Sequence, residues 1–195
     1  MGEPCDTHME AALHIVKYLK GTSSTGLYYH SAADLKLEAY CDSDWATCPI
    51  TRRSLTGYCI FLGPNIVSWK TKKQPTVSRS SCEAEYRRMA NTVCELQWLS
   101  YLLKDFQLQV QTPIPLWCDN KSALHIAANP VYHERTKHIE VDCHVIRDKF
   151  KEDFILPQHI PTQLQVADLF TKSLSKPQFQ SLMSKLGLVS QQAPS

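Results

Sequence analysis

The segment Leu35-Lys36-Leu37-Glu38-Ala39-Tyr40-Cys41-Asp42-Ser43-Asp44 decides the fold. Apolar and more polar residues alternate from Leu35 to Cys41, a period of two that predicts a strand with one buried face. Two more apolar runs follow, Thr56–Leu62 and Ile66–Trp69, and the turn signal Gly63-Pro64-Asn65 joins them. We therefore expect three meandering strands, the first of which ends at Asp42 and Asp44.

Strands and helices alternate in the rest of the chain. Apolar residues spaced by three or four predict one long helix over Ser80–Gln107. The segments expected after it are strand Pro113–Cys118, helices Lys121–Ala128 and His138–Phe150, strand Phe154–Ile160, a final helix near Gln163–Ser173 opened by the capping box Thr162-x-x-Gln165, and a short helix within Pro177–Leu188 before the polar tail Ser190–Ser195. A helix over Thr7–Lys20 and an extended Leu27–His30 precede the meander. This order predicts an α/β fold, a mixed sheet with helices on its faces.

Composition is that of an ordinary globular protein. The chain has 195 residues, 43% hydrophobic and 21% charged, and a net charge of +2, so any basic surface must be local. Its eight cysteines form no CxxC pair, and several lie in apolar runs, which indicates reduced thiols in an intracellular protein. We find no signal peptide and no apolar run long enough to span a membrane.

Four acids fall at positions where a site can form. Asp42 and Asp119 end strands, Glu83 lies in the first turn of the long helix, and Asp168 lies on the last predicted helix. Strand ends of such sheets converge on a crevice, and acids gathered there repel one another unless cations neutralise them. Hard oxygen ligands suit Mg²⁺ or Mn²⁺, and a pair of such ions can cleave a phosphodiester.

Each acid also has a purely structural reading. Asp42 or Asp44 can end a strand in a turn, and Asp168 can be a solvated helix residue. Glu83 follows Ser80 by three positions, which is the spacing of a helix capping box. Asp119 can cap the helix that begins at Lys121. Spacing alone makes a nuclease only the leading suggestion.

Longer motifs resemble one known family. They are Tyr40-Cys41-Asp42-Ser43-Asp44-Trp45-Ala46, Arg52-Arg53-Ser54-Leu55-Thr56-Gly57-Tyr58, Ser68-Trp69-Lys70-Thr71-Lys72-Lys73-Gln74-Pro75-Thr76-Val77, Ser80-Ser81-Cys82-Glu83-Ala84-Glu85-Tyr86, Cys118-Asp119-Asn120-Lys121-Ser122-Ala123, Arg135-Thr136-Lys137-His138-Ile139 and Ala167-Asp168-Leu169-Phe170-Thr171-Lys172. From about Pro4 to Leu188 the chain resembles the ribonuclease H (RNase H) region of copia-type retrotransposon Pol polyproteins. Several long motifs in one order make the resemblance specific.

The resemblance implies an RNase H-like fold with a mixed five-stranded sheet flanked by helices. It further implies hydrolysis of the RNA strand of RNA–DNA hybrids with two Mg²⁺ ions, for which Mn²⁺ can substitute. Carried over by position, the catalytic and metal-binding acids are Asp42, Glu83, Asp119 and Asp168, and Asp44 is a candidate supporting acid beside them. The histidine that many cellular relatives carry before the last helix is missing from Ile160–Val166, and we give His159 no catalytic role.

Nucleic-acid contacts are expected from clustered cations. The candidates are Arg52, Arg53, Lys70, Lys72, Lys73, Arg135 and Lys137. Contacts of such residues with phosphates supply affinity that depends on salt. The bland alternative is a solvated charge run, because a basic patch must be spatial and not merely sequential.

The resemblance also divides the chain into three parts. Residues 1–33 resemble the end of the reverse transcriptase, 34–176 the RNase H domain, and 177–195 form a C-terminal helix and polar tail. The expected partners are an RNA–DNA hybrid and the reverse transcriptase portion of the same polyprotein, in cytoplasmic retrotransposon particles, and no polymerase activity is expected. The alternatives are a catalytically silent nucleic-acid-binding or structural module and an integrase-type strand transferase; the position of Glu83 before Asp119 disfavours the second.

Overall fold

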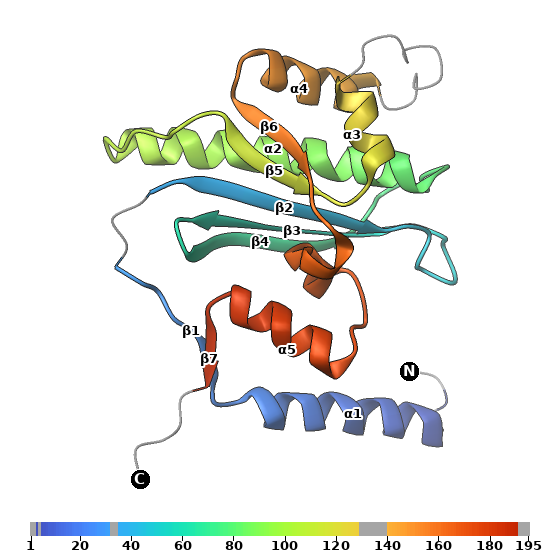
Figure 1. Ribbon diagram of the computed structural model, residues 1–195. Helices are drawn as coiled ribbons and strands as arrows, with labels where there is room; N and C mark the ends of the chain where they lie inside the picture. Colours follow the sequence, from blue (N-terminus) through green and yellow to red (C-terminus); the bar gives the residue numbers. More distant parts are fainter. Residues whose placement is uncertain (1–2, 4, 32–34, 129–139, 191–195) are drawn as a thin grey trace.

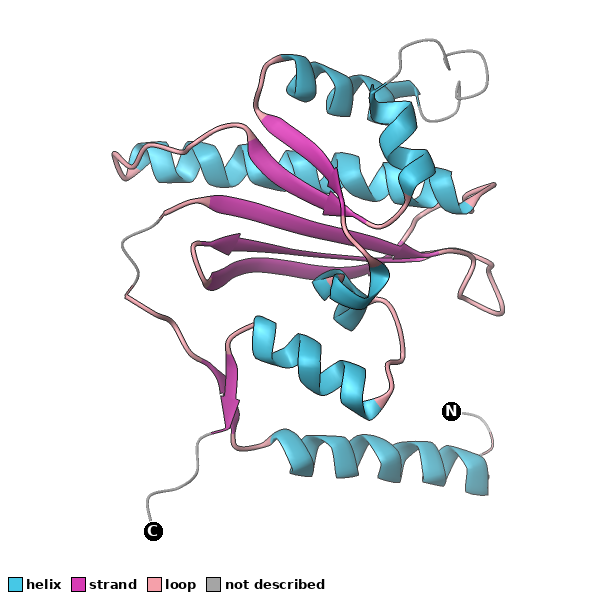
Figure 2. Ribbon diagram, viewed as in Figure 1, coloured by secondary structure: helices cyan, strands magenta, loops and turns pink. Residues whose placement is uncertain are grey.

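Five of the strands form one mixed sheet in the computed structural model, which describes residues 3, 5–31, 35–128 and 140–190. The sheet contains β2 (Leu37–Asp44), β3 (Leu55–Leu62), β4 (Asn65–Lys73), β5 (Ile114–Cys118) and β6 (Ile155–His159), in the order β4-β3-β2-β5-β6 (Figure 2). Strands β2, β3 and β4 pair antiparallel, whereas β5 is parallel to β2 and to β6. The predicted meander and mixed five-stranded sheet are confirmed.

Helices cover both faces of this sheet. Helices α2 (Ser81–Asp105), α3 (Lys121–Ala128) and α4 (Glu140–Lys151) lie on one face, and the short helical turn η4 (Val166–Phe170) and α5 (Lys176–Lys185) lie on the other (Figure 1). Successive side chains of β2 point to opposite faces of the sheet, so this strand packs against the helices on both sides. Ala39 and Cys41 belong to the larger buried cluster under α2, whereas Tyr40 packs against the smaller cluster on the η4 side.

The segment after β6 differs from the prediction. A final helix over Gln163–Ser173 is wrong, because the structure has two 3₁₀ turns there, η3 (Thr162–Leu164) and η4. The buried Gln165 separates them: its amide donates to the Cys41 carbonyl at 3.1 Å and accepts from the Ala167 amide at 3.2 Å. These two hydrogen bonds of Gln165 satisfy a backbone carbonyl of β2 and a backbone amide of η4. They take the place of the capping box predicted for one continuous helix.

Segments from the two ends of the chain lie together beside η4. Strand β1 (Thr25–Leu27) pairs antiparallel with β7 (Leu188–Ser190), so the end of the predicted short helix and the first residue of the predicted polar tail form a strand. Helix α1 (Asp6–Thr22) lies next to α5 (Figure 1), and the rings of Tyr18 and Phe179 meet edge to face with centroids 6.2 Å apart. None of the described residues of α1 is buried.

The remaining expectations about the chain concern thiols and membranes. All eight cysteines are free, as their isolated spacing predicted. Among the described helices, none combines the length and apolar character that crossing a membrane requires.

Candidate metal centre

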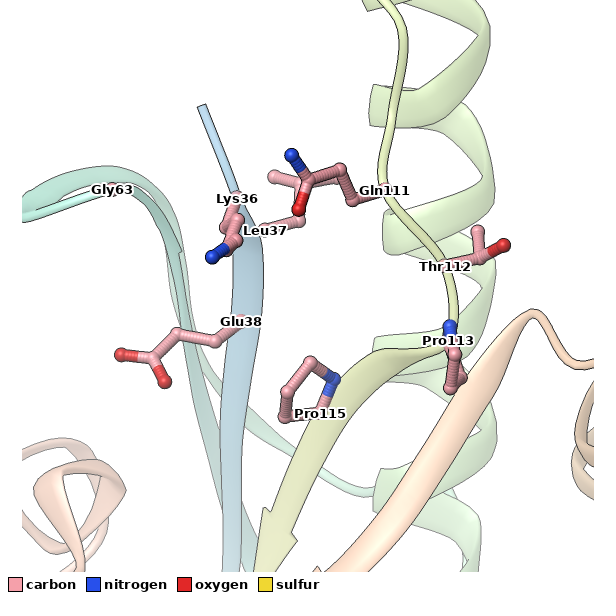
Figure 3. Close-up of a pocket in the computed structure, with 8 residues that line it drawn as sticks. All are labelled: Lys36, Leu37, Glu38, Gly63, Gln111, Thr112, Pro113 and Pro115. Atoms are coloured by element: carbon pink, nitrogen blue, oxygen red, sulfur yellow. The ribbon is translucent and has the colours of Figure 1, made fainter. Parts of the chain in front are cut away.

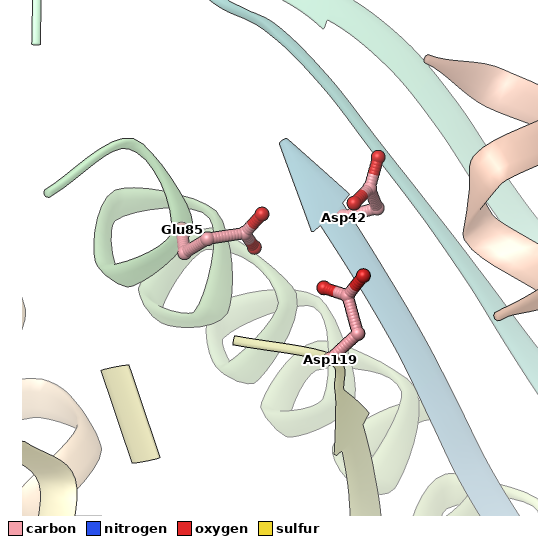
Figure 4. Close-up of side chains that lie close together, drawn as sticks. All are labelled: Asp42, Glu85 and Asp119. Carbon is pink, nitrogen blue, oxygen red and sulfur yellow. The ribbon is translucent and has the colours of Figure 1, made fainter. Parts of the chain in front are cut away.

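Three carboxylates meet at one end of the sheet. Asp42 lies near the end of β2, Asp119 follows β5, and Glu85 lies in the second turn of α2 (Figure 4). One oxygen from each carboxylate lies within 4.8 Å of the other two. Because β2 and β5 run parallel, their carboxyl ends meet at this edge, and α2 enters the same edge from the side. The predicted convergence of strand-end acids is therefore present.

Asp42 is buried beside a lysine. Its side chain accepts hydrogen bonds from the Thr171 hydroxyl and, at 3.1 Å, from the Lys172 ammonium. Burial raises the pKa of Asp42, the charge and hydrogen bonds of these two partners oppose that rise, and the negative charge of Asp119 adds to it. No role for Thr171 or Lys172 was predicted from the sequence, although Lys172 follows Asp168 by four positions.

Glu85 is 3% exposed and is held by the backbone of β2. Its Oε1 accepts a hydrogen bond from the Ser43 amide at 2.9 Å. Burial first, and then the charges of Cys118, Asp42 and Asp119, raise the pKa of Glu85 well above its ordinary value. Ionising this carboxyl beside two aspartates is costly unless a cation lies among them.

Asp119 is the half-buried member of the cluster. Its Oδ2 accepts from the Thr162 hydroxyl at 3.0 Å, a contact that links the end of β5 to η3. Asp119 does not cap α3, because the cap is its neighbour Asn120, whose Oδ1 accepts from the Ala123 amide at 3.0 Å. The structural reading of Asp119 as a helix cap is thus wrong.

Asp168 joins the site through Lys172. It is 1% exposed on η4, and its Oδ1 lies 2.7 Å from the Lys172 ammonium, which therefore bridges Asp168 and Asp42. Burial raises the pKa of Asp168 to about 6, against the hydrogen bond from Lys172 and together with repulsion from Asp42. The two buried carboxylates raise the pKa of Lys172, so its charge is retained.

Glu83, unlike Asp168, makes its hydrogen bonds and its ion pair among the described residues at the start of α2, and it is not a member of the cluster of Asp42, Glu85 and Asp119. Its Oε2 accepts from the Arg79 amide at 2.8 Å, its Oε1 pairs with Arg87 at 2.9 Å, and its own amide donates to the Ser80 hydroxyl at 3.1 Å. These contacts are those of a helix N-terminus, so the capping reading of Glu83 is supported and Glu85 takes its place among the acids. Since residues two apart on a helix do not share a face, only one of the two glutamates can point at Asp42.

One signal in the sequence could have selected Glu85. Ser80-x-x-Glu83 already accounts for Glu83 as a cap, which leaves Glu85 without a structural task in the same motif. The neighbouring acid Asp44 ends β2, is half-buried, and lies outside the cluster of three. His159 lies in β6 and is exposed.

The cationic residues predicted to bind nucleic acid do not form one cluster among the described residues. Lys70, Lys72 and Lys73 line a pocket between β4 and α2, whereas Arg53 donates to the Pro75 carbonyl and Arg52 is an exposed loop residue with positive φ. Arg135 and Lys137 lie outside the described residues. A different pocket of about 420 Å³, lined by Lys36, Glu38 and Gln111 among others, lies at the far end of the sheet and contains none of the clustered acids (Figure 3).

Curated relatives of this chain are retrotransposon Pol polyproteins, the family that its sequence motifs resemble. The chain is 41% identical over 188 residues to the Retrovirus-related Pol polyprotein from transposon RE1 of Arabidopsis thaliana, and 34% identical over 185 residues to that from transposon TNT 1-94 of Nicotiana tabacum. These matches cover 96% and 95% of the chain. The chain belongs to the copia-type retrotransposon Pol family. It spans 13% and 14% of the length of these two Pol polyproteins.

The solved structures place this Pol segment in the RNase H fold. It resembles the N-terminal RNase H domain of a Mycobacterium tuberculosis protein with a TM-score of 0.52 at 12% identity, over 77% of this chain and 97% of that one. At that identity the likeness concerns the fold alone. No protein-family profile matches the chain.

Proposed function

We propose that this Pol segment is a ribonuclease H that hydrolyses the RNA strand of RNA–DNA hybrids while the element is reverse transcribed in its cytoplasmic particle. The observation that carries the proposal is the meeting of Asp42, Glu85 and Asp119 within 4.8 Å, at the carboxyl ends of two parallel strands. Its RNase H fold and its membership of the Pol family support RNA–DNA hybrids as the proposed substrate class. The proposal concerns this segment only, because the chain spans 13% of the length of the RE1 polyprotein.

The donor set fits divalent metal ions. The carboxylates of Asp42, Glu85 and Asp119 are hard oxygen ligands, and their mutual repulsion in a buried site is relieved by a cation. Asp168 lies beside Asp42 and is the fourth proposed ligand, so two Mg²⁺ ions have four carboxylates to share. When bound, such ions activate a water and neutralise charge on the phosphate oxygens.

The residues of the chain position these carboxylates. Ser43 holds Glu85 through its backbone amide, Thr162 holds Asp119, and Thr171 holds Asp42. Each carboxylate is fixed by a donor from another element, which sets the ligands before any ion arrives. Lys172 neutralises Asp42 and Asp168 in the metal-free site, a role that bound ions would replace.

The proposed partners are the hybrid and the reverse transcriptase portion of the same polyprotein. Helix α1, in the segment predicted to belong to that polymerase, exposes Leu13, Val16 and Leu19 by half or more. Apolar side chains on one helix are normally buried against another protein surface. We propose that the polymerase portion supplies that surface, and that it also adds contacts with the hybrid.

A catalytically silent module is the second candidate. The observation that favours it is Lys172, whose ammonium occupies the position between Asp42 and Asp168 that a metal ion would need. In that case the domain would bind nucleic acid without cutting it.

Cleavage of a labelled RNA–DNA hybrid separates the two candidates. With Mg²⁺ or Mn²⁺ we expect cutting of the RNA strand only, no cutting of duplex DNA, and at least a roughly 100-fold loss in Asp119→Asn because a carboxylate ligand of the proposed metal ions is removed. A folded wild-type protein that cuts in neither metal, even with the polymerase portion supplied, would support the silent module.

A further inference from the structure

One cation of α2 is buried where this helix packs on the sheet. Arg88 is 3% exposed, whereas buried neighbours on the same helix, such as Met89 and Leu96, are apolar members of the larger cluster. Apolar contacts are non-directional and tolerate small rotations of a helix about its axis, whereas a hydrogen bond depends on angle as well as distance. Packing against β2 therefore decides which face of α2 meets the sheet, and a polar contact can set its rotation more finely.

The contacts of Arg88 reach one place in β3. Its Nε donates to the Gly57 carbonyl at 3.0 Å, and its guanidinium carbon lies 4.1 Å from the centroid of the Tyr58 ring. Gly57 is the register partner of Asp42 in β2. Arg88 thus connects α2 to the sheet directly beside the strand position that carries a clustered acid.

Gly57 is also the residue at which η4 meets the sheet. A Cβ at this position would collide with Phe170 and Thr171, and Thr171 donates a hydrogen bond to Asp42. The Gly57 carbonyl is therefore held by α2, while its Cα is covered from the η4 side. Through Gly57, Arg88 connects the helix that carries Glu85 with the segment that holds Asp42.

Glu85 precedes Arg88 by three positions, so the two side chains lie on the same side of α2. The Glu85 carboxylate accepts from the Ser43 amide of β2 at 2.9 Å. The helix is thus bound to β2 through Glu85 and to β3 through Arg88, and two such contacts about one turn apart define a rotation that one contact does not. Ligands of a metal site must be held to within roughly 0.5 Å, so this rotation matters for the Glu85 carboxylate.

Stability does not account for the burial of Arg88. Its Nη2 is buried without a hydrogen-bond partner among the described residues, and burial lowers the pKa of Arg88 to about 10. An unused buried donor costs free energy, and replacing buried ionic groups by apolar ones is often neutral or stabilising. The best-attested use of such groups is to fix register. Arg88 is therefore better explained by the position that it imposes on α2.

We infer that Arg88 is a positioning residue for the metal centre: its hydrogen bond to Gly57 fixes the rotation of α2 at which the Glu85 carboxylate faces Asp42 and Asp119. The inference rests on the proposed function, which makes these carboxylates metal ligands. Arg88 acts through Gly57 and Glu85 and not on the substrate.

The Mn²⁺ affinity of the folded protein, measured by calorimetric titration, tests this role. Arg88→Met removes the hydrogen bond and keeps a long side chain, and Arg88→Lys keeps a charged donor. The matched control is Thr92→Val, which removes a buried hydroxyl of the same helix whose hydrogen bond, to the Arg88 carbonyl at 3.0 Å, stays within α2. Melting curves in EDTA verify that each protein is folded at the temperature of the titration.

We expect Arg88→Met to bind Mn²⁺ about tenfold more weakly, the low end of the effects of groups that orient metal ligands. Loss of a cation would by charge alone strengthen Mn²⁺ binding, so the sign of the change separates the positioning role from electrostatic attraction. Arg88→Lys should recover part of the affinity, and Thr92→Val should match wild type.

Unchanged or tighter Mn²⁺ binding by Arg88→Met would overturn the inference. An equal loss in Thr92→Val would overturn it too, because the effect would then be a general loosening of α2. Wild type that cleaves the hybrid, beside an Arg88→Met variant with unchanged Mn²⁺ affinity, would leave the nuclease standing without this role. Wild type whose Mn²⁺ binding depends on Arg88 but which never cuts would refute the nuclease and leave the positioning of Glu85 standing.

Discussion

The two glutamates of α2, Glu83 and Glu85, have different tasks although they lie two positions apart. Glu83 closes the helix N-terminus through Arg79 and Arg87, whereas Glu85 points at Asp42 and Asp119. The sequence shows Glu-x-Glu and a capping spacing, but it does not show which side chain faces the sheet. That choice depends on the rotation of α2 about its axis, which packing against β2 fixes.

Substituting the two glutamates separately tests this division. Glu85→Gln should abolish most Mn²⁺ binding in a calorimetric titration, because it removes a ligand charge from the cluster. Glu83→Gln should keep Mn²⁺ binding and lower the free energy of unfolding by about 1 kcal/mol, as expected for a weakened helix cap. The assignment fails if Glu83→Gln loses the metal and Glu85→Gln retains it.

The Lys172 ammonium lies 3.1 Å from Asp42 and 2.7 Å from Asp168, where it would compete with a metal ion for these carboxylates. Lys172→Met should therefore bind Mn²⁺ about tenfold more tightly, while the metal-free protein melts at a lower temperature because two buried carboxylates lose their counter-charge. Lys172→Arg keeps the charge and serves as the control. Unchanged Mn²⁺ affinity in Lys172→Met would show that no ion enters between these two acids.

Contact between β3 and η4 positions Thr171 against Asp42. A Cβ added to Gly57 would lie 2.6 Å from the Phe170 Cβ and 2.9 Å from the Thr171 Cγ2, so η4 must shift to accommodate it. Gly57→Ala should cost about 1–3 kcal/mol of unfolding free energy, as overpacking does, and should weaken Mn²⁺ binding. Gly26→Ala, where the added Cβ meets nothing within 4 Å, is the matched control for denaturant unfolding. Equal stability of the two variants would contradict the close approach.

Regular elements were predictable because local periodicity determines them. The alternation in Leu35–Cys41 predicted β2, and the three- and four-residue spacing predicted α2 almost to its ends. The proximity of Asp42 and Asp119 was also predictable, because both acids lie at strand ends that converge at one edge of the sheet. Elements fixed by distant contacts were not predictable: η4 depends on Gln165 reaching the Cys41 carbonyl, and β7 exists because β1 lies beside it.

The acid cluster also sets how stability of the whole domain depends on pH. Burial raises the pKa values of Asp42, Glu85 and Asp168, the last to about 6, so the native state binds more protons than the unfolded chain above pH 4. The contribution of these groups is therefore largest at acidic pH and falls as pH rises through about 6.

In EDTA, the free energy of unfolding attributable to these groups should fall by on the order of 1–2 kcal/mol between pH 5 and pH 7.5. Urea unfolding at the two pH values measures it, and Glu85→Gln should flatten the dependence because one of the acids is gone. Mg²⁺ should restore stability at pH 7.5, where the acids are ionised. A wild type and a Glu85→Gln variant with the same pH dependence would show that Glu85 does not titrate in the cluster.

The most direct test of the whole account is single-turnover cleavage of a hybrid labelled on its RNA strand, with wild type, Glu85→Gln and Glu83→Gln side by side in Mg²⁺ or Mn²⁺. We predict metal-dependent RNA cutting by wild type and by Glu83→Gln, and at least a roughly 100-fold loss in Glu85→Gln. Folded wild-type protein that leaves the RNA intact in both metals, or full activity in Glu85→Gln, would contradict a nuclease built on Asp42, Glu85 and Asp119.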